Sequence, residues 1–151
     1  MLDGDLATRS AALDEIVEAL RMRHDELVEC GVERIFAEIP AYVAFAATAF
    51  VDDVRRHVGL HHDAVIRSLA ARRPLDPHEL GFMRPEVTRR VGRIPLADFM
   101  QGFRVYMEVL WEALLESAVD KHGREAALDA AGIVIRYINN AASEEIGRAH
   151  V

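Results

Sequence analysis

The sequence predicts an all-α fold, with residues 1–151 forming a single domain. Apolar residues recur at three- and four-residue steps almost throughout, which is the spacing of helices with one buried face. No segment alternates apolar and polar residues as a half-buried strand does, and none is rich in β-branched residues between turn signals. A chain of 151 residues is also long enough to bury a core of its own.

The N-terminal part of the chain is predicted to form two helices that end before Pro40. Ser10 can cap the first helix, and Gly31 can close it in a left-handed conformation. The second helix then meets the proline, which lacks a backbone donor and disfavours helix at Ile39 before it. We therefore expect one helix end at Gly31 and a break between Ile39 and Pro40.

The middle of the chain is predicted to form two further helices and a loop. One helix covers about residues 41–57, and Gly59 is expected to end it, because glycine weakens a helix interior. A short helix follows over about residues 62–72. Residues 73–75, which contain a proline, are predicted to be a loop.

A capping sequence marks the start of the next helix. Asp76 can cap it, Pro77 suits its first turn, and Glu79 can reach back to the backbone amide of the cap. We expect this helix to end near Gly92.

The last two predicted helices are long. Pro95 opens the first, which runs to about His122, and Gly123 is expected to break it. The second begins near Arg124 and meets no capping glycine or proline before Val151, so we expect it to continue into a segment of a longer protein. The predicted inner face of the first long helix consists of Leu96, Phe99, Met100, Phe103, Met107, Leu110, Trp111 and Leu114.

Six to eight helices with a long final pair suit a compact bundle or a globin-like packing, so we expect a compact globin-like helical bundle. The longest apolar run, residues 41–51, is too short to cross a bilayer, and the acidic N-terminus lacks the order of a signal peptide. Cys30 is the only cysteine and cannot form an intrachain disulfide, which favours a cytoplasmic location.

No catalytic site is predicted, so we expect that the protein is not an enzyme. Its serines lie in helical sequence without a Gly-x-Ser-x-Gly turn, and its glycines form no phosphate-binding loop. A net charge of −7 makes the chain a poor candidate for binding nucleic acid by itself.

Three of the histidines are the candidates for a metal or haem site. His57 and His61 have the four-residue spacing that places two ligands on one helix face. However, Gly59 lies between them, and no further His or Cys completes a tetrahedral set, although Asp53 could contribute a carboxylate. We interpret His57, His61 and His62 as exposed residues at a helix junction, with no metal site and no cofactor. Haem, which needs an axial histidine facing an apolar pocket, stays the alternative.

Four segments, taken together, resemble a known family. They are Glu38-Ile39-Pro40-Ala41-Tyr42; Arg72-Arg73-Pro74-Leu75 followed by Glu79-Leu80 and Arg84; Arg89-Arg90-Val91-Gly92-Arg93-Ile94-Pro95-Leu96, running on through Phe103-Arg104 to Leu110-Trp111-Glu112; and Tyr137-Ile138-Asn139-Asn140-Ala141-Ala142-Ser143 leading to Gly147-Arg148-Ala149. In order and spacing they resemble the N-terminal domain of PucR-type (CdaR-like) transcription regulators of actinobacteria. That domain is similar to the RsbR/RsbRD N-terminal domain, a globin-like module of stressosome proteins that lacks haem. One departure is Val91-Gly92, where relatives usually have Ala-Glu.

The resemblance implies a regulatory signal-input and dimerisation domain of a bacterial helix-turn-helix regulator. Its signal would be an unknown small molecule or protein, and it would form a homodimer through its last two helices. A packing change would pass down the last helix, and DNA would be bound only by a C-terminal domain that this chain lacks. Two alternatives stay open: a stressosome-like scaffold domain that binds proteins, and a haem-binding sensor globin.

The candidate ligand-binding residues are four aromatic residues and one arginine that lie in or beside these segments. Tyr42, Phe103, Tyr106 and Trp111 are either ligand contacts or ordinary core residues. Arg104 lies within an apolar helix, and burying a lone guanidinium is costly. It is therefore expected either to pair with Glu108 or Glu38 or to bind an anionic ligand.

Overall fold

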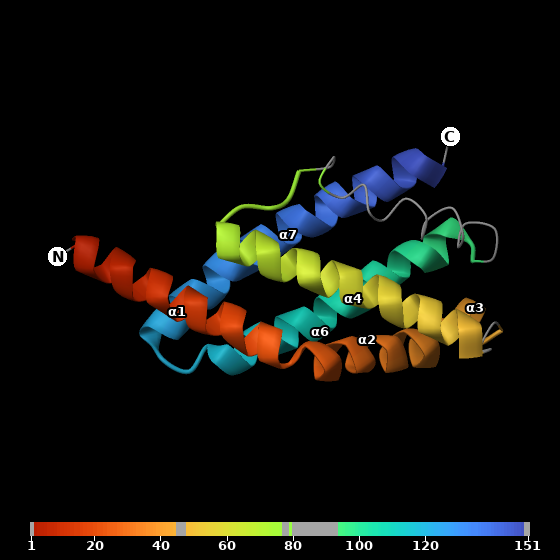
Figure 1. Cartoon of the computed structure of the whole chain (residues 1–151), viewed down its shortest axis with the longest axis horizontal. Helices are drawn as coiled ribbons and strands as arrows, with labels where there is room; N and C mark the ends of the chain where they lie inside the picture. The colour runs from red at the N-terminus through yellow and green to blue at the C-terminus, as the bar shows by residue number, and fades with distance from the viewer. Residues whose placement is uncertain (1, 45–47, 77–78, 80–93, 150–151) are drawn as a thin grey trace.

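The computed structural model describes residues 2–44, 48–76, 79 and 94–149 of the chain (Figure 1). Within these residues every regular element is a helix and there is no strand, so the all-α prediction is confirmed. The helices are α1 (Leu2–Met22), α2 (His24–Glu38), α3 (Pro40–Val43), α4 (Thr48–Ala71), α6 (Leu96–Ser117) and α7 (Lys121–Ala149).

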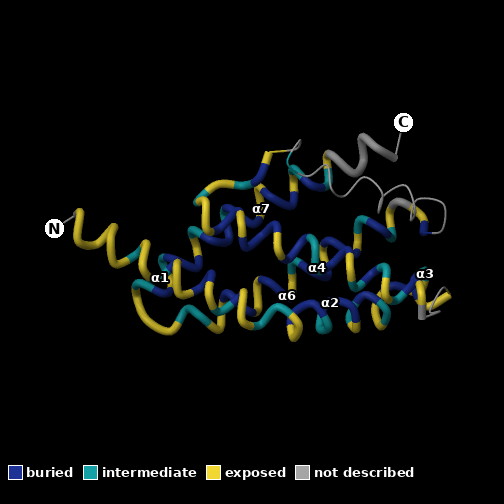
Figure 2. The backbone as a smooth tube through the Cα atoms, viewed as in Figure 1, coloured by how far each residue is buried: buried dark blue, intermediate teal, exposed yellow. Residues whose placement is uncertain are grey.

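The helices lie side by side in an elongated bundle. The longest, α7, packs against α1, α4 and α6, whereas α2 packs against α4 and α6. Figure 2 shows buried residues facing the middle of the bundle, while the first turns of α1 are exposed beyond its end. A displacement of α1, α4 or α6 would therefore act on α7 directly.

The N-terminal helices do not divide at Gly31, as the sequence predicted. Gly31 is buried inside α2, where an added Cβ would meet Tyr106 Cδ2 at 3.4 Å. The glycine therefore serves a close approach of helices and not a helix end. The break lies instead at Arg23, whose φ of −93° and ψ of 16° depart from the helix. Ser10 was wrongly predicted as the N-cap, because α1 begins at Leu2 and passes through it.

The predicted break before Pro40 is confirmed. Ile39 has an extended backbone, with φ −113° and ψ 101°, and α3 begins at the proline. The predicted end at Gly59 is wrong, since α4 runs without interruption to Ala71. One glycine costs a helix about 1 kcal/mol. That cost is smaller than the gain from burying side chains such as Val58 beside it.

The C-terminus of α4 is closed by a Schellman motif. Arg72 takes the left-handed conformation, with φ 61°, that glycine usually supplies. The Arg73 amide donates to the Ser68 carbonyl at 3.1 Å, and the Arg72 amide donates to the Leu69 carbonyl at 3.1 Å. The predicted loop at residues 73–75 follows directly.

Most of the helix predicted to end near Gly92 lies outside the described residues. Its first contact is described: the Asp76 amide donates to Glu79 Oε1 at 3.1 Å, as the capping sequence predicted. Pro95 is the N-cap of α6, in agreement with the sequence.

The connection between the last two helices differs from the prediction. The first ends at Ser117 and not at His122, and Gly123 lies in the first turn of α7 and not at a break. The Gly123 amide donates to Asp120 Oδ1 at 2.7 Å, so Asp120 caps α7. A Cβ on Gly123 would lie 2.8 Å from the Ser117 carbonyl oxygen, a distance that only glycine avoids.

The core draws large apolar side chains from every described helix. It includes Leu13, Val17, Val28, Ile35, Tyr42, Val54, Leu69, Phe103, Leu110, Val134 and Tyr137. No described helix is both long enough and apolar enough to traverse a bilayer.

Candidate functional site

Three histidines of α4 lie in the core of the bundle. His57, His61 and His62 are all buried, the last completely. Our interpretation of them as exposed residues at a helix junction is therefore wrong. The error follows from the misplaced helix end at Gly59, because an unbroken α4 turns all three side chains towards neighbouring helices.

Both ring nitrogens of His62 form hydrogen bonds. Nε2 lies 2.9 Å from the Leu20 carbonyl oxygen, and Nδ1 lies 2.5 Å from the Tyr106 hydroxyl. A carbonyl only accepts, so Nε2 carries the proton and Tyr106 donates to Nδ1. Burial lowers the pKa of His62, which favours this neutral form. The Leu20 carbonyl lies in the last turn of α1, where the break at Arg23 leaves carbonyl oxygens without a donor from the same helix. His62 supplies the missing hydrogen-bond donor to this carbonyl.

His61 links α4 to α7. Its Nδ1 lies 2.7 Å from the Tyr137 hydroxyl, and its Nε2 lies 3.1 Å from Nε2 of His57. One of the two facing Nε2 atoms must carry the proton for that hydrogen bond. Together with the bonds of His62, these contacts connect α4 to α1, α6 and α7 through buried polar groups.

A small cavity of about 30 Å³ adjoins this network, between α2, α3, α4 and α6. Tyr42, Phe103 and Tyr106, three of the candidate ligand residues, line it together with His57 and His61. The structure thus brings these three together, and it also buries all of them in the core. A cavity of this size holds one or two water molecules. Metabolites occupy pockets of about 300–1,000 Å³, so neither a metabolite nor a haem fits among these side chains as they lie.

The other two candidate residues lie elsewhere, on the outer face of α6. Arg104 is exposed, so the premise that its guanidinium is buried is wrong. Among the described residues it forms no ion pair with Glu38 or Glu108. Trp111, predicted on the inner face, is 44% exposed. Seven residues separate the two, so both lie on one side of α6, away from the cavity.

Beside Trp111 lies an exposed apolar surface that the sequence analysis did not identify. We call it the α6–α7 apolar surface. Its exposed residues are Trp111 and Leu115 of α6 and Leu128 and Ile135 of α7, and Met107 is half-buried. The buried side chains of Leu114, Ala131 and Val134 lie beneath them, at the floor of the groove between the two helices. Leu115 is 53% exposed, Leu128 67% and Ile135 51%, and a groove of about 220 Å³ runs between the two helices. The seven-residue spacing of Leu128 and Ile135 was the available signal.

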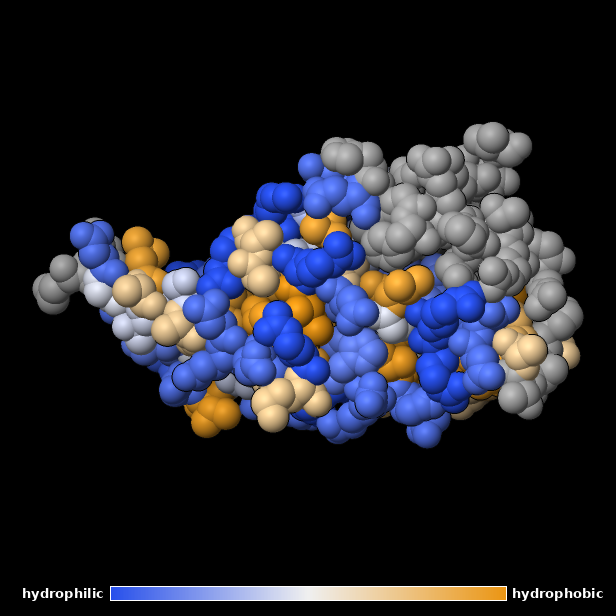
Figure 3. All heavy atoms as spheres, in the orientation of Figure 1, coloured by the Kyte–Doolittle hydropathy of each residue, from blue (hydrophilic) through white to orange (hydrophobic). Residues whose placement is uncertain are grey.

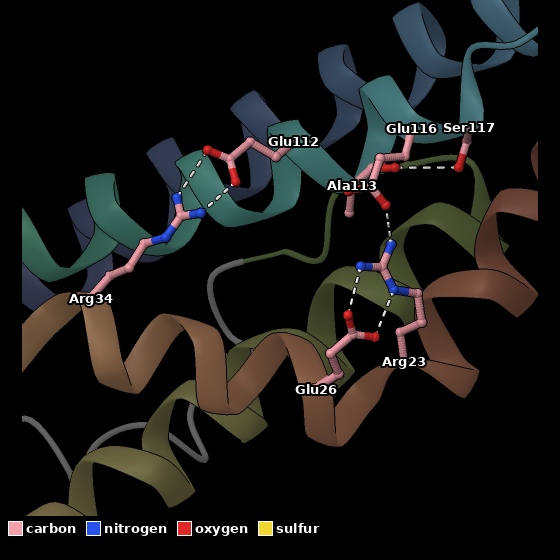
Figure 4. Close-up of polar contacts among 7 residues, drawn as sticks. All are labelled: Arg23, Glu26, Arg34, Glu112, Ala113, Glu116 and Ser117. Atoms are coloured by element: carbon pink, nitrogen blue, oxygen red, sulfur yellow. Dashed lines mark hydrogen bonds and ion pairs between the residues drawn. The ribbon is translucent and has the colours of Figure 1, made fainter.

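Ion pairs hold the opposite edge of α6 against the N-terminal helices (Figure 4). Arg34 donates two hydrogen bonds to Glu112, and Arg23 donates to both Glu26 and Glu116. The hydrogen bonds from Arg34 hold the pKa of Glu112 below its usual range. These contacts orient α6 so that Trp111, next to Glu112, faces outward.

Two of the motif segments contact each other. The Asn140 side-chain amide donates to the Leu75 carbonyl at 3.2 Å, and Ser68 Oγ accepts from the Leu75 amide at 3.2 Å. The Arg72–Leu75 and Tyr137–Ser143 segments therefore fasten the end of α4 to α7.

Comparison with known proteins identifies the family. The family model described as RsbT co-antagonist protein rsbRD N-terminal domain matches residues 25–145, which begin two residues after the break at Arg23. No curated protein and no solved structure gives a significant match. The globin-like packing expected above therefore stays a prediction, as does the narrower resemblance to PucR-type regulators. Since the match spans most of the chain, the protein belongs to the family of rsbRD N-terminal domains of RsbT co-antagonist proteins.

Proposed function

We propose that this protein is the signal-input and dimerisation domain of a bacterial PucR-type helix-turn-helix transcription regulator. It is not an enzyme, it acts in the cytoplasm, and it passes a packing change through its last helix. Membership of the rsbRD N-terminal family supports a regulatory sensory or scaffold role. The observation that carries the proposal is the α6–α7 apolar surface.

Dimerisation explains why large apolar side chains lie together on the outside. Single exposed leucines are common, but a patch that joins Trp111 to Leu128 and Ile135 across two helices is typical of an interaction site. Tryptophan is also among the residues that most often dominate interface energetics. Two copies of this surface, related by a twofold axis, would form a four-helix bundle from two α6–α7 pairs.

The packing of α7 supports the signalling role. This helix contacts α1, α4 and α6, and its Tyr137 hydroxyl is bonded to the buried His61. A ligand that moves any of these helices acts on α7 directly. In the proposed mechanism, α7 then carries the displacement to the DNA-binding part of the full protein.

The oligomeric state tests the proposal. We expect light scattering after gel filtration at micromolar concentration to give the mass of a dimer, and Leu128→Glu to give a monomer with unchanged helical circular dichroism. Val43→Glu is the matched control, because Val43 is also an exposed aliphatic residue, at 55%, but lies on α3. A monomeric wild-type chain, or a Leu128→Glu variant that still dimerises, would contradict the proposal.

A stressosome-like scaffold is the second candidate. The family description names a co-antagonist protein, which acts through another protein, and the same surface would suit such a partner. The sequence of the full protein after Val151 distinguishes the regulator from the scaffold. A helix-turn-helix there favours the regulator, and a phosphorylatable sulfate-transporter-like domain favours the scaffold.

A further inference from the structure

A groove lined by one arginine of α1, one of α7 and one that directly follows α4 lies away from the core network. It has a volume of about 500 Å³ and runs between α1, α7 and the end of α4. Arg9, Arg72 and Arg136 line it, together with Asp129, and Leu13 and Ile133 supply apolar walls. We call it the arginine groove. In Figure 3 the first turns of α1 project from the body of the molecule.

Two of the three guanidinium groups are neutralised by carboxylates. Arg9 donates to both carboxylate oxygens of Asp129, each at 2.6 Å, which ties α1 to α7. Arg72 donates to Asp14 at 2.7 Å and to the hydroxyl and carbonyl of Ser10 at 3.0 and 3.1 Å. These contacts fix the two arginines at the wall of the groove.

The third guanidinium has no acidic partner in the part of the chain that the structure describes. Arg136 is exposed, and its Nε donates to the Gly132 carbonyl at 3.3 Å. Among the described residues no carboxylate pairs with it. Its other N–H groups are therefore available in a groove where two further guanidinium groups are already held in place. Guanidinium groups favour carboxylate and phosphate oxygens, which accept two parallel hydrogen bonds.

We propose that the arginine groove binds a small organic anion, a carboxylate or phosphate with a short apolar chain. The anionic head pairs with Arg136 beside Arg72, and the chain lies against Leu13 and Ile133. The volume of the groove lies within the range of about 300–1,000 Å³ that is usual for small-molecule sites. The proposal rests on the proposed function in one respect: it takes α7, which carries Arg136, as the helix that transmits the signal.

Binding would act on the helices that form the groove. Arg9 and Arg72 already join α1 to α7 and α1 to the end of α4. An anion held between Arg136 and Arg72 adds a direct bridge from α7 to α4. It also competes with Asp129 and Asp14 for the guanidinium groups, so the ligand changes how α7 is held.

The test uses titration calorimetry on the full chain with octanoate and octyl phosphate as probes, below their micellar concentrations. Octanol and octylamine are the neutral and cationic controls. We expect the anions to bind, and Arg136→Gln to weaken them about tenfold, the usual effect of losing one charge-assisted contact. Arg104→Gln is the matched control, since Arg104 is an exposed arginine on α6 that forms no ion pair with any described residue.

Several results would overturn the proposal. These are equal binding of octanol and octanoate, unchanged affinity in Arg136→Gln, or an equal loss in Arg104→Gln. Anionic headgroups also occur on membranes, so binding to vesicles of phosphatidylglycerol is measured as well. Binding to the vesicles without binding to octanoate or octyl phosphate would replace a free ligand with a lipid surface and refute the proposal.

The oligomeric state separates this site from the proposed function. Leu128→Glu should keep anion binding and lose the dimer, whereas Arg136→Gln should weaken anion binding about tenfold and keep the dimer.

Discussion

The hydrogen bond between Tyr106 and His62 gives the sharpest test of the core network. Tyr106→Phe removes only the hydroxyl, which lies 2.5 Å from His62 Nδ1. Both side chains are buried, so bulk solvent does not supply a replacement for the lost donor. The substitution therefore leaves a buried acceptor without a partner, at an expected cost of about 1–3 kcal/mol in the free energy of unfolding.

That cost corresponds to a measurable change in melting temperature. For a domain of this size, 1 kcal/mol lowers the midpoint by about 2–4 °C, so Tyr106→Phe should melt about 2–12 °C below the wild type. Thermal and urea unfolding followed by circular dichroism would give both quantities at pH 7.5, where His62 is neutral.

A double-mutant cycle separates the hydrogen bond from changes in packing. If the two side chains interact as described, Tyr106→Phe and His62→Leu should be non-additive, with a coupling free energy of about 0.5–3 kcal/mol. A loss below about 0.5 kcal/mol in Tyr106→Phe, or strict additivity, would refute the reasoning about this bond.

Two further predictions concern pH and glycine. Because burial lowers the pKa of His62, the unfolded chain takes up a proton near the ordinary value of about 6.5 before the folded chain does. The contribution of His62 to stability should therefore be complete above that pH and fall below it. The urea midpoint should drop between pH 7.5 and pH 5.5, and it should drop less in His62→Gln than in the wild type. An equal drop in both proteins would contradict this. Gly123→Ala should destabilise by about 1–3 kcal/mol, since its Cβ would lie 2.8 Å from the Ser117 carbonyl oxygen. Gly132→Ala, whose Cβ meets nothing within 4 Å, should be neutral or stabilising by up to about 1 kcal/mol in the same melting assay, and a similar loss in both variants would count against the steric account.

The sequence predicted the features that depend on local chemistry. The break before Pro40, the loop after Arg72 and the helix start at Pro95 all follow from restrictions that proline places on its neighbours. The helix ends expected at Gly31 and Gly59 were wrong because local chemistry does not decide them. A glycine costs a helix only about 1 kcal/mol, and burial of neighbouring side chains outweighs that cost.

The remaining errors concern contacts between residues far apart in the chain. The α1–α2 break at Arg23 carries no glycine or proline, and the open carbonyl of Leu20 there is satisfied by His62 from α4. The burial of the histidines could not be predicted once α4 was wrongly divided. Trp111 was placed inside because the apolar stripe of α6 is wide, and only the position of α7 decides which edge of it stays exposed.

The hydrogen bond from His62 to the end of α1 determines which residues a shortened version of this domain must keep. The family match begins at Asp25, yet Leu13, Ile16 and Leu20 of α1 are buried against the rest of the bundle. A fragment trimmed to the matched residues would leave the His62 Nε2–H without its acceptor and uncover apolar surface on α4 and α7. Expression of the homologous segment alone would therefore yield a weakened protein, and the N-terminal helix belongs in any version prepared for ligand screening.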